Sequence, residues 1–89
     1  MRSYGYVEQI QHLETQLNED WRDEEITFVT LDLDRFSSHM MLEVECSTIE
    51  DAEKILEKTE VYLEELDTVW YDGKREESSN IYLFFRSEE

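Results

Sequence analysis

The chain has 89 residues, of which 24 are Asp or Glu and 8 are Lys or Arg, and its formal net charge is −16. So much negative charge repels nucleic acids and anionic lipids, which excludes direct binding to DNA, RNA or a membrane surface and favours a basic partner. A single cysteine excludes an internal disulfide and suits a reducing cytoplasm, the compartment we expect.

Two further properties bound the architecture. The length predicts one domain, and a hydrophobic content of 39 % with eleven aromatic residues predicts a folded chain rather than an acidic disordered tail. The polar N-terminus predicts no signal peptide, and no apolar run approaches the roughly 20 residues that a membrane span requires. The chain has no proline and only two glycines, which suits long regular elements.

The first half predicts a helix followed by a β-hairpin. Residues 3–19 carry apolar side chains at helical spacing, at Tyr6, Ile10, Leu13 and Leu17. Residues 25–34 and 39–46 alternate in the manner of strands, with a turn between them at 35–38. The expected register, which places the apolar positions on one face, pairs Leu33 with Met40, Leu31 with Leu42 and Val29 with Val44.

The second half repeats this order. A helix is expected to begin at Ser47 or Thr48, because each is followed three residues later by an acidic residue in a capping-box pattern, and to end near Leu66. Residues 68–71 predict a short strand, Asp72-Gly73 a turn that a loop over 74–79 lengthens, and 80–86 a last strand. The expected buried stripe of the helix is Ile49, Ala52, Ile55, Leu56, Thr59, Tyr62, Leu63 and Leu66.

The predicted fold is therefore α+β, with the order α-β-β-α-β-β. Its two α-β-β units span about 3–46 and 47–86 of a single domain, 1–89. The simplest closure is a four-stranded antiparallel sheet with both helices packed on one face.

The second predicted helix carries a row of carboxylates. The spacing 3, 4, 3, 4 keeps side chains on one helical stripe, about 21 Å long with a carboxylate about every 5 Å. A phosphate backbone presents negative charge at a comparable pitch, about 3.4 Å of axis per step of one strand. We name this set the glutamate row: Glu50, Glu53, Glu57, Glu60 and Glu64.

A solvated helix face is the alternative reading of the glutamate row. Like charges three or four residues apart destabilise a helix by a few tenths of a kcal/mol each, which argues that something other than stability keeps them. The face of the first hairpin turned away from the predicted core adds more carboxylates, with charge protection of a sheet surface as the alternative there. These are Asp32, Asp34, Glu43 and Glu45.

Catalysis, metal binding and a cofactor are not expected. His12 and His39 lie apart on a helix and a strand, and Cys46 falls at an inward strand position where a cysteine behaves as a small hydrophobe. No nucleophile elbow, phosphate loop or Cys/His metal spacing occurs, and Asp32-x-Asp34 is only a fragment of a calcium loop. We therefore expect a binding protein and not an enzyme.

Aromatic residues fall on both faces of the last predicted hairpin. They are Trp70, Tyr71, Tyr82 and Phe84. One face belongs to the core, and we expect the other to be covered by a partner or by a second copy of the chain.

In size, composition and carboxylate arrays (Glu50 to Glu64, with Asp32, Asp34, Glu43 and Glu45) the chain resembles the small acidic DNA-mimic proteins that phages direct against host restriction or CRISPR nucleases. The resemblance implies a stoichiometric inhibitor acting in the host cytoplasm. Its carboxylates would occupy the basic nucleic-acid groove of a host nuclease complex, with Trp21 or Tyr62 as aromatic anchors.

Two other interpretations remain open. The chain could be a small acidic interaction module, such as an antitoxin, an immunity protein or a regulatory subunit that neutralises a basic enzyme. It could also be an ordinary domain from a high-salt organism, which would lose its fold at low ionic strength because unscreened repulsion would dominate.

Overall fold

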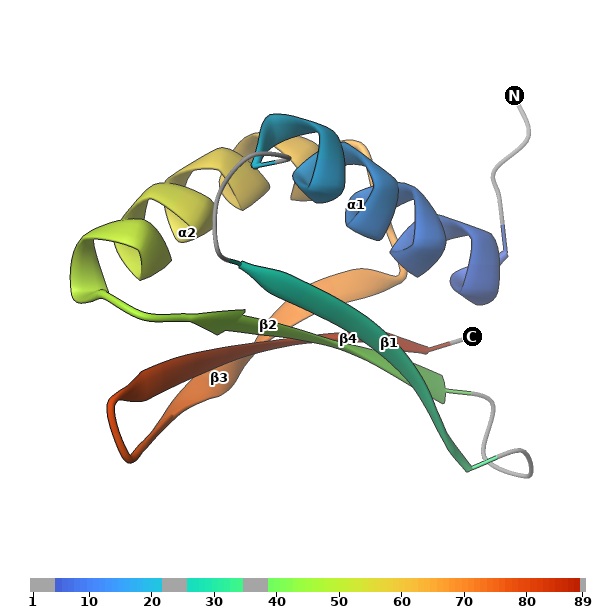
Figure 1. Ribbon diagram of the computed structural model, residues 1–89. Helices are drawn as coiled ribbons and strands as arrows, with labels where there is room; N and C mark the ends of the chain where they lie inside the picture. The colour runs from blue at the N-terminus through green and yellow to red at the C-terminus, as the bar shows by residue number, and fades with distance from the viewer. Residues whose placement is uncertain (1–4, 22–25, 35–38, 89) are drawn as a thin grey trace.

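The computed structural model describes residues 5–21, 26–34 and 39–88, with the backbone alone for 28–34. The element order is α1 (Tyr6–Asp20), β1 (Thr27–Asp34), β2 (His39–Cys46), α2 (Ile49–Leu63), β3 (Val69–Glu77) and β4 (Asn80–Glu88). The predicted α+β class is confirmed. All pairings in the sheet are antiparallel, in the order β1-β2-β4-β3. Both helices lie side by side over one face of this sheet (Figure 1).

The hydrophobic core fills the space between the helices and the sheet. α1 contributes three of the four residues of its predicted stripe, Ile10, Leu13 and Leu17, each fully buried, while Tyr6 is only partly buried. The two central strands meet it with alternating buried positions, which are Leu42, Val44 and Cys46 on β2 and Ile81, Leu83, Phe85 and Ser87 on β4. Helical and strand periodicity therefore converge on one layer, as the sequence predicts.

A buried polar network ties α1 to the sheet. The Gln9 side chain is 2 % exposed; its Nε2 donates to Asp67 Oδ1 at 2.7 Å and its Oε1 accepts from the Thr68 backbone N–H at 3.1 Å. Ser87 Oγ donates to the Tyr6 carbonyl oxygen at 2.7 Å and lies 2.9 Å from Thr68 Oγ1. Satisfying these groups offsets the cost of burying them, so the network fixes where α1 begins relative to β3 and β4.

The register of the first hairpin differs from the prediction. The backbone pairs Phe28 with Val44 and Thr30 with Leu42, one residue away from the expected Val29–Val44 and Leu31–Leu42 pairs, and it becomes irregular between Leu31 and Asp34. The predicted Leu33–Met40 pair falls in this irregular stretch. In β1, apolar residues occur at both odd-numbered and even-numbered positions, so alternation alone did not select the buried face. A shift of one residue in the register exchanges the two faces of the strand.

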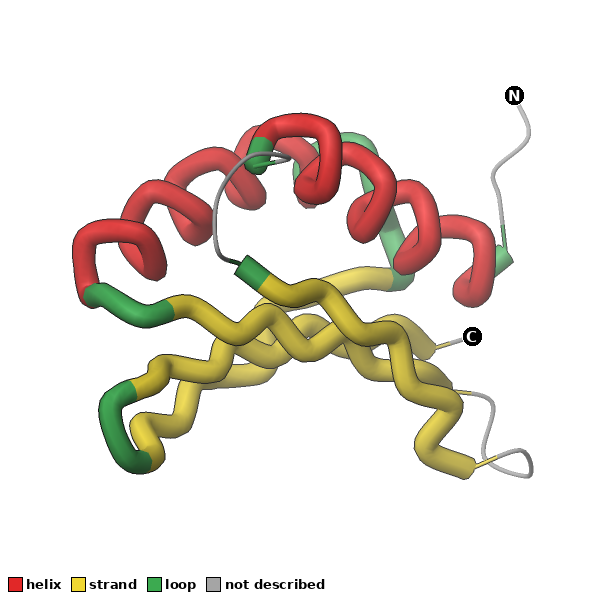
Figure 2. The backbone as a smooth tube through the Cα atoms, in the orientation of Figure 1, coloured by secondary structure: helices red, strands yellow, loops and turns green. Residues whose placement is uncertain are grey.

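The second hairpin is longer than predicted. Asp72-Gly73, expected as the turn, instead forms an irregularity inside β3, where Tyr71 pairs with Phe85 and Gly73 with Phe84, so that Asp72 is the extra residue. Gly73 has a φ of 121°, a conformation that a residue without a Cβ adopts at little cost. The chain reverses only after Glu77, at Ser78-Ser79 (Figure 2).

The boundaries of α2 confirm one predicted cap and correct one core residue. Thr48 is the N-cap, and its Oγ1 accepts a hydrogen bond from the Asp51 N–H at 3.1 Å. Ile49, predicted inside the buried stripe, is 57 % exposed. At the first position of the helix it lies beyond the region that α1 and the sheet cover.

Removing the cap hydroxyl tests this boundary. We expect Thr48→Ala to lower the free energy of unfolding by about 1 kcal/mol, because the Asp51 N–H loses its acceptor. For a domain of this size the melting temperature should fall by roughly 4–8 °C in thermal unfolding followed by circular dichroism. Ser47→Ala is the control, since Ser47 makes no capping bond within the described residues; an equal loss there would contradict the assignment.

Candidate acidic interface

α2 positions the glutamate row on the surface of the molecule. All five members are exposed, four within the helix and Glu64 as its helical C-cap residue with φ −61°. The opposite side of α2 buries Ala52, Ile55 and Thr59 against the core. One face of the helix therefore makes the fold and leaves the row available to a partner.

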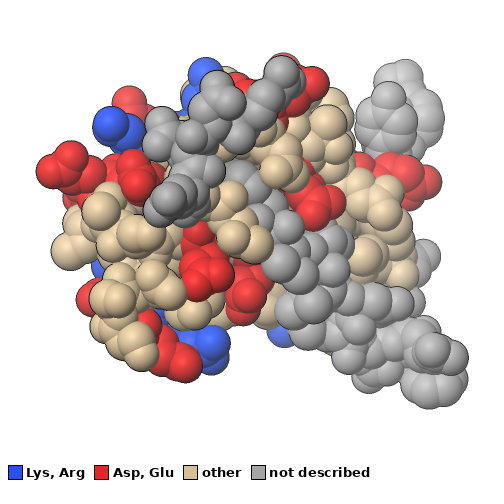
Figure 3. Space-filling model, in the orientation of Figure 1, with Lys and Arg blue, Asp and Glu red and all other residues tan. Residues whose placement is uncertain are grey.

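The charges in the second half of the row work against the helix that carries them. Glu57, Glu60 and Glu64 follow one another at i+3 and i+4, and no basic residue occupies the last turn, where the helix dipole favours positive charge. Lys54 and Lys58 stand on the same helix, but within the described part of the chain no ion pair joins them to the row. Figure 3 shows carboxylates spread over this face of the molecule, with a few separate basic side chains among them.

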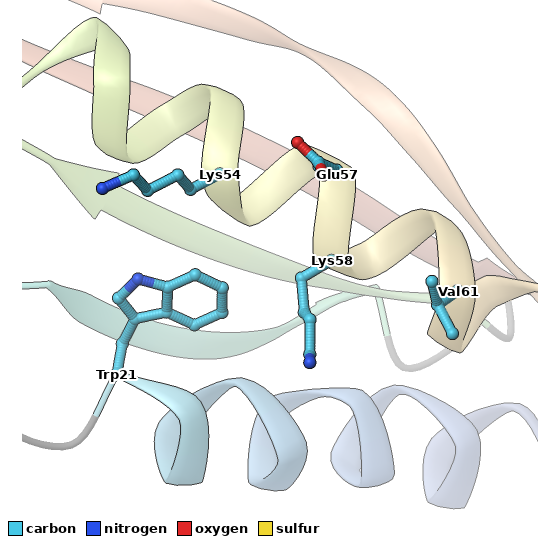
Figure 4. Close-up of a pocket in the computed structure, with 5 residues that line it drawn as sticks. All are labelled: Trp21, Lys54, Glu57, Lys58 and Val61. Carbon is cyan, nitrogen blue, oxygen red and sulfur yellow. The ribbon is translucent and has the colours of Figure 1, made fainter.

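A hollow of about 250 Å³ borders the row on the side of α1. It is lined by Trp21, Lys54, Glu57, Lys58 and Val61. The Trp21 ring reaches from the end of α1 towards α2, beneath Lys54 and beside Lys58 (Figure 4). Val61 is 60 % exposed at a position where helical periodicity predicts a polar residue. An apolar residue on the polar side of the predicted helix was therefore the sequence signal for this hollow, and the prediction did not use it.

A second hollow, of about 230 Å³, borders the row on the side of β3. It is lined by Leu56, Thr59, Glu60, Leu63 and Tyr71. Sequence reasoning missed it, because only the packed structure brings Tyr71 next to α2. The row thus runs between two hollows with apolar walls, and Glu57 and Glu60 each line one of them.

The hairpin carboxylates do not extend this surface. Leu42, Val44 and Cys46 of β2 are buried under the helices, so the alternate residues Glu43 and Glu45 belong to the opposite face of the sheet. Glu45 Oε2 accepts from Asn80 Nδ2 at 2.8 Å and from the Tyr82 hydroxyl at 3.3 Å. The side chains of Asp32 and Asp34 lie outside the described residues. The row and the two described hairpin glutamates are therefore separate surfaces.

The two aromatic anchors named from the sequence have different surroundings. Trp21 is partly buried and lines the first hollow. The Tyr62 hydroxyl donates to Asp20 Oδ2, which together with burial raises the Tyr62 pKa to about 12. Trp21 is therefore open to a partner, whereas Tyr62 already connects the two helices.

The residues considered for catalysis are dispersed. His12 is exposed on α1, and His39 begins β2. No group of three potential metal-ligating side chains is found in the parts of the chain that the structure describes. Nor does any helix among those parts have the length and apolar character needed to cross a membrane.

Cys46 provides a test of the core. Burial, with smaller contributions from Asp51 and Glu45, raises the pKa of its thiol from 9.0 to about 11. A thiol whose pKa is higher in the folded chain ionises first in the unfolded chain, so the free energy of unfolding should fall as the pH rises from about 9 to 11. Raised Tyr62 and Tyr71 pKa values act in the same direction.

We expect Cys46 to react with a disulfide reagent at neutral pH at least 100-fold more slowly in the folded protein than in urea, because it is buried and protonated. Urea unfolding of Cys46→Ala, measured at pH 8 and pH 10, should show a smaller alkaline loss of stability than the wild type. Rapid labelling of the native protein would contradict the burial of the thiol.

Compared with known proteins, the chain matches no protein-family model, no curated protein and no solved structure.

Proposed function

We propose that the chain is an acidic inhibitor that occupies the basic nucleic-acid-binding groove of a target protein, such as a nuclease complex of the restriction or CRISPR type. The observation that carries this proposal is the glutamate row: five exposed carboxylates in register along about 21 Å of one helix, without ion pairs to described residues and at a cost to the helix. Evenly spaced carboxylates can replace phosphates as partners of arginine and lysine.

The hollows on either side of the row add a means of specificity. Carboxylates alone would bind many basic surfaces, weakly and in a salt-sensitive manner. A partner side chain that enters the hollow beside Trp21, or the one beside Tyr71, would contribute apolar burial that salt does not screen. The row would then speed the encounter, and the hollows would slow dissociation.

Glu43 and Glu45 play no part in this contact as we propose it, because they belong to the other face of the sheet. The proposal therefore removes Glu43 and Glu45 from the predicted partner-binding set and keeps the row; the predicted role of Asp32 and Asp34 stays a prediction, because their side chains lie outside the described residues. The protein would act without a cofactor, without binding nucleic acid itself, and in the cytoplasm of the cell that holds the target.

The test is capture from a bacterial lysate with the tagged protein, followed by elution with excess duplex DNA. We expect nucleic-acid enzymes among the DNA-eluted proteins, and we expect them to be absent when the bait is the Glu53→Lys, Glu57→Lys, Glu60→Lys variant. A single partner that DNA cannot displace would contradict mimicry and favour the antitoxin-like module. Loss of the circular-dichroism signal at low ionic strength would favour the halophile interpretation.

A further inference from the structure

The face of the sheet turned away from the helices carries a strip of large side chains on three of its four strands, β2, β4 and β3. Met41, Tyr82 and Phe84 are partly buried there, and Trp70 is 40 % exposed. Both helices pack on the other face (Figure 1), and no described element covers the strip. Apolar surface of this kind on a small domain commonly marks an interface.

The register places these residues in levels across the three strands, with β4 in the middle. At one level Glu45 pairs with Tyr82, which pairs with Arg75. At another level Met41 pairs with Arg86, which pairs with Trp70. Glu45 and Arg75 thus lie on opposite sides of β4 at the same height, as do Met41 and Trp70.

This arrangement is complementary to itself. A two-fold axis along β4 keeps each level at its height and exchanges the strands on either side of β4, so that β3 of a second copy lies over β2. Arg75 of the second copy then faces Glu45, and Trp70 of the second copy faces Met41. Tyr82, Phe84 and Arg86 lie near the axis on β4 and meet the same residues of the second copy. Asp72 Oδ2, 3.9 Å from Arg86 Nε, offsets the charge of each of the two guanidinium groups. Sheets packed face to face cross at about 30°, which suits a contact of a few central strands.

The geometry and charge of this strip point to a second copy of the chain as its occupant, and we propose that the protein forms a two-fold homodimer through it. Arg75 Cζ lies 5.5 Å from the ring centroids of both Tyr82 and Phe84, so its cation already stands over the strip. Its exposed ion pair with Glu77, at 3.3 Å, contributes little and can be exchanged for Glu45 of the second copy. In this dimer the two glutamate rows lie on opposite outer sides, clear of the contact. The inference does not depend on the proposed function.

Salt distinguishes this contact from binding to a basic partner. Each chain carries a net charge of −16, so two copies repel each other until salt screens them, and we expect the dimer to strengthen as salt increases. Binding of the row to a basic groove must weaken over the same range. The homodimer and the proposed binding to a basic partner can therefore be disproved independently of each other.

The experiment is sedimentation equilibrium of the purified chain at low and moderate salt, with circular dichroism on every variant. We expect a species of twice the 10.8 kDa chain mass at moderate salt. Arg75→Glu should raise the dimer dissociation constant about tenfold, because it places like charges together twice in a symmetric contact. Lys74→Glu is the matched control: it makes the same charge change at the neighbouring residue, which pairs with buried Leu83 and so belongs to the helix-covered face.

Mixing two variants provides the sharper test. Arg75→Glu leaves two acidic residues at the paired positions, and Glu45→Arg leaves two basic residues there, so neither variant should self-associate well. Mixed together, they should form a heterodimer at least as stable as the wild-type dimer. A monomer at every salt and protein concentration would overturn the proposal. Equal weakening of the dimer by Arg75→Glu and Lys74→Glu would also overturn it, and so would failure of the two folded variants, Arg75→Glu and Glu45→Arg, to form a heterodimer. If Glu45→Arg does not fold, the comparison of Arg75→Glu with Lys74→Glu still tests the proposal.

Discussion

Replacing Glu53, Glu57 and Glu60 together by lysine is expected to slow association with the captured target about 100-fold at low salt. The three side chains are exposed at the middle of the row, and electrostatic steering contributes factors of about 10 to 1,000 to association rates. The rate is measured by surface plasmon resonance over a series of salt concentrations. The slope of the wild-type rate against salt should be steep, and that of the variant shallow.

The fold of the triple variant should be preserved. The substitution makes the pairs at positions 50/53 and 60/64 opposite in charge but leaves 53/57 and 57/60 like-charged, now as lysines. These effects on α2 nearly cancel, so the thermal unfolding midpoint should stay close to that of the wild type. The control replaces Glu19, Glu76 and Glu77, exposed residues outside the row, by lysine and makes the same change in net charge. If this control slows association as much as the row variant does, net charge and not the row governs the encounter, and the proposed function fails.

Replacing Phe85 by alanine is expected to cost about 3–5 kcal/mol of stability. Phe85 is fully buried on the central strand β4, and its ring centroid lies 5.5 Å from that of Tyr71. A domain of this length has a total stability on the order of 5–10 kcal/mol, so a large part of it would be lost. Urea unfolding should show a much lower midpoint with an unchanged slope.

Phe84→Ala is the control for Phe85→Ala. Phe84 is adjacent in sequence but lies on the helix-free face and is only partly buried, so its loss should cost less than about 2 kcal/mol when measured on the monomer at low protein concentration. A similar cost at both positions would mean that the two faces of β4 are equally buried. That result would contradict the position of the core.

The glutamate row was predictable because it depends only on helical geometry. A helix places residues at spacings of 3 and 4 on one side whatever it packs against, so one good helix prediction fixed all five positions. The N-cap at Thr48 and the buried stripe of α1 followed from equally local rules, and the structure confirms both.

The relation between the two carboxylate groups was not predictable, although every residue in them was named. Whether Glu43 and Glu45 join the row depends on which face of the sheet α2 covers. That choice is made by burial of Leu42 and Val44 against α1 and α2, contacts between elements far apart in the chain.

Local turn signals failed where tertiary pairing could override them. Asp72-Gly73 has the chemistry of a tight turn, yet β4 offers a partner to eight of the nine residues of β3, and the strand continues past the glycine with Asp72 as the extra residue. The gain of further ladder hydrogen bonds outweighs the preference of a dipeptide.

The sequence by itself determined the α+β class, the order of the elements, the charge and the glutamate row, because periodicity, composition and helix caps act over a few residues. Only the tertiary structure decided the β1-β2-β4-β3 order, the register of both hairpins, the hollows beside α2 and the separation of the acidic surfaces. These features depend on which distant segments bury each other's apolar faces. Alternation along a strand restricts which segments can pair but does not select one pairing.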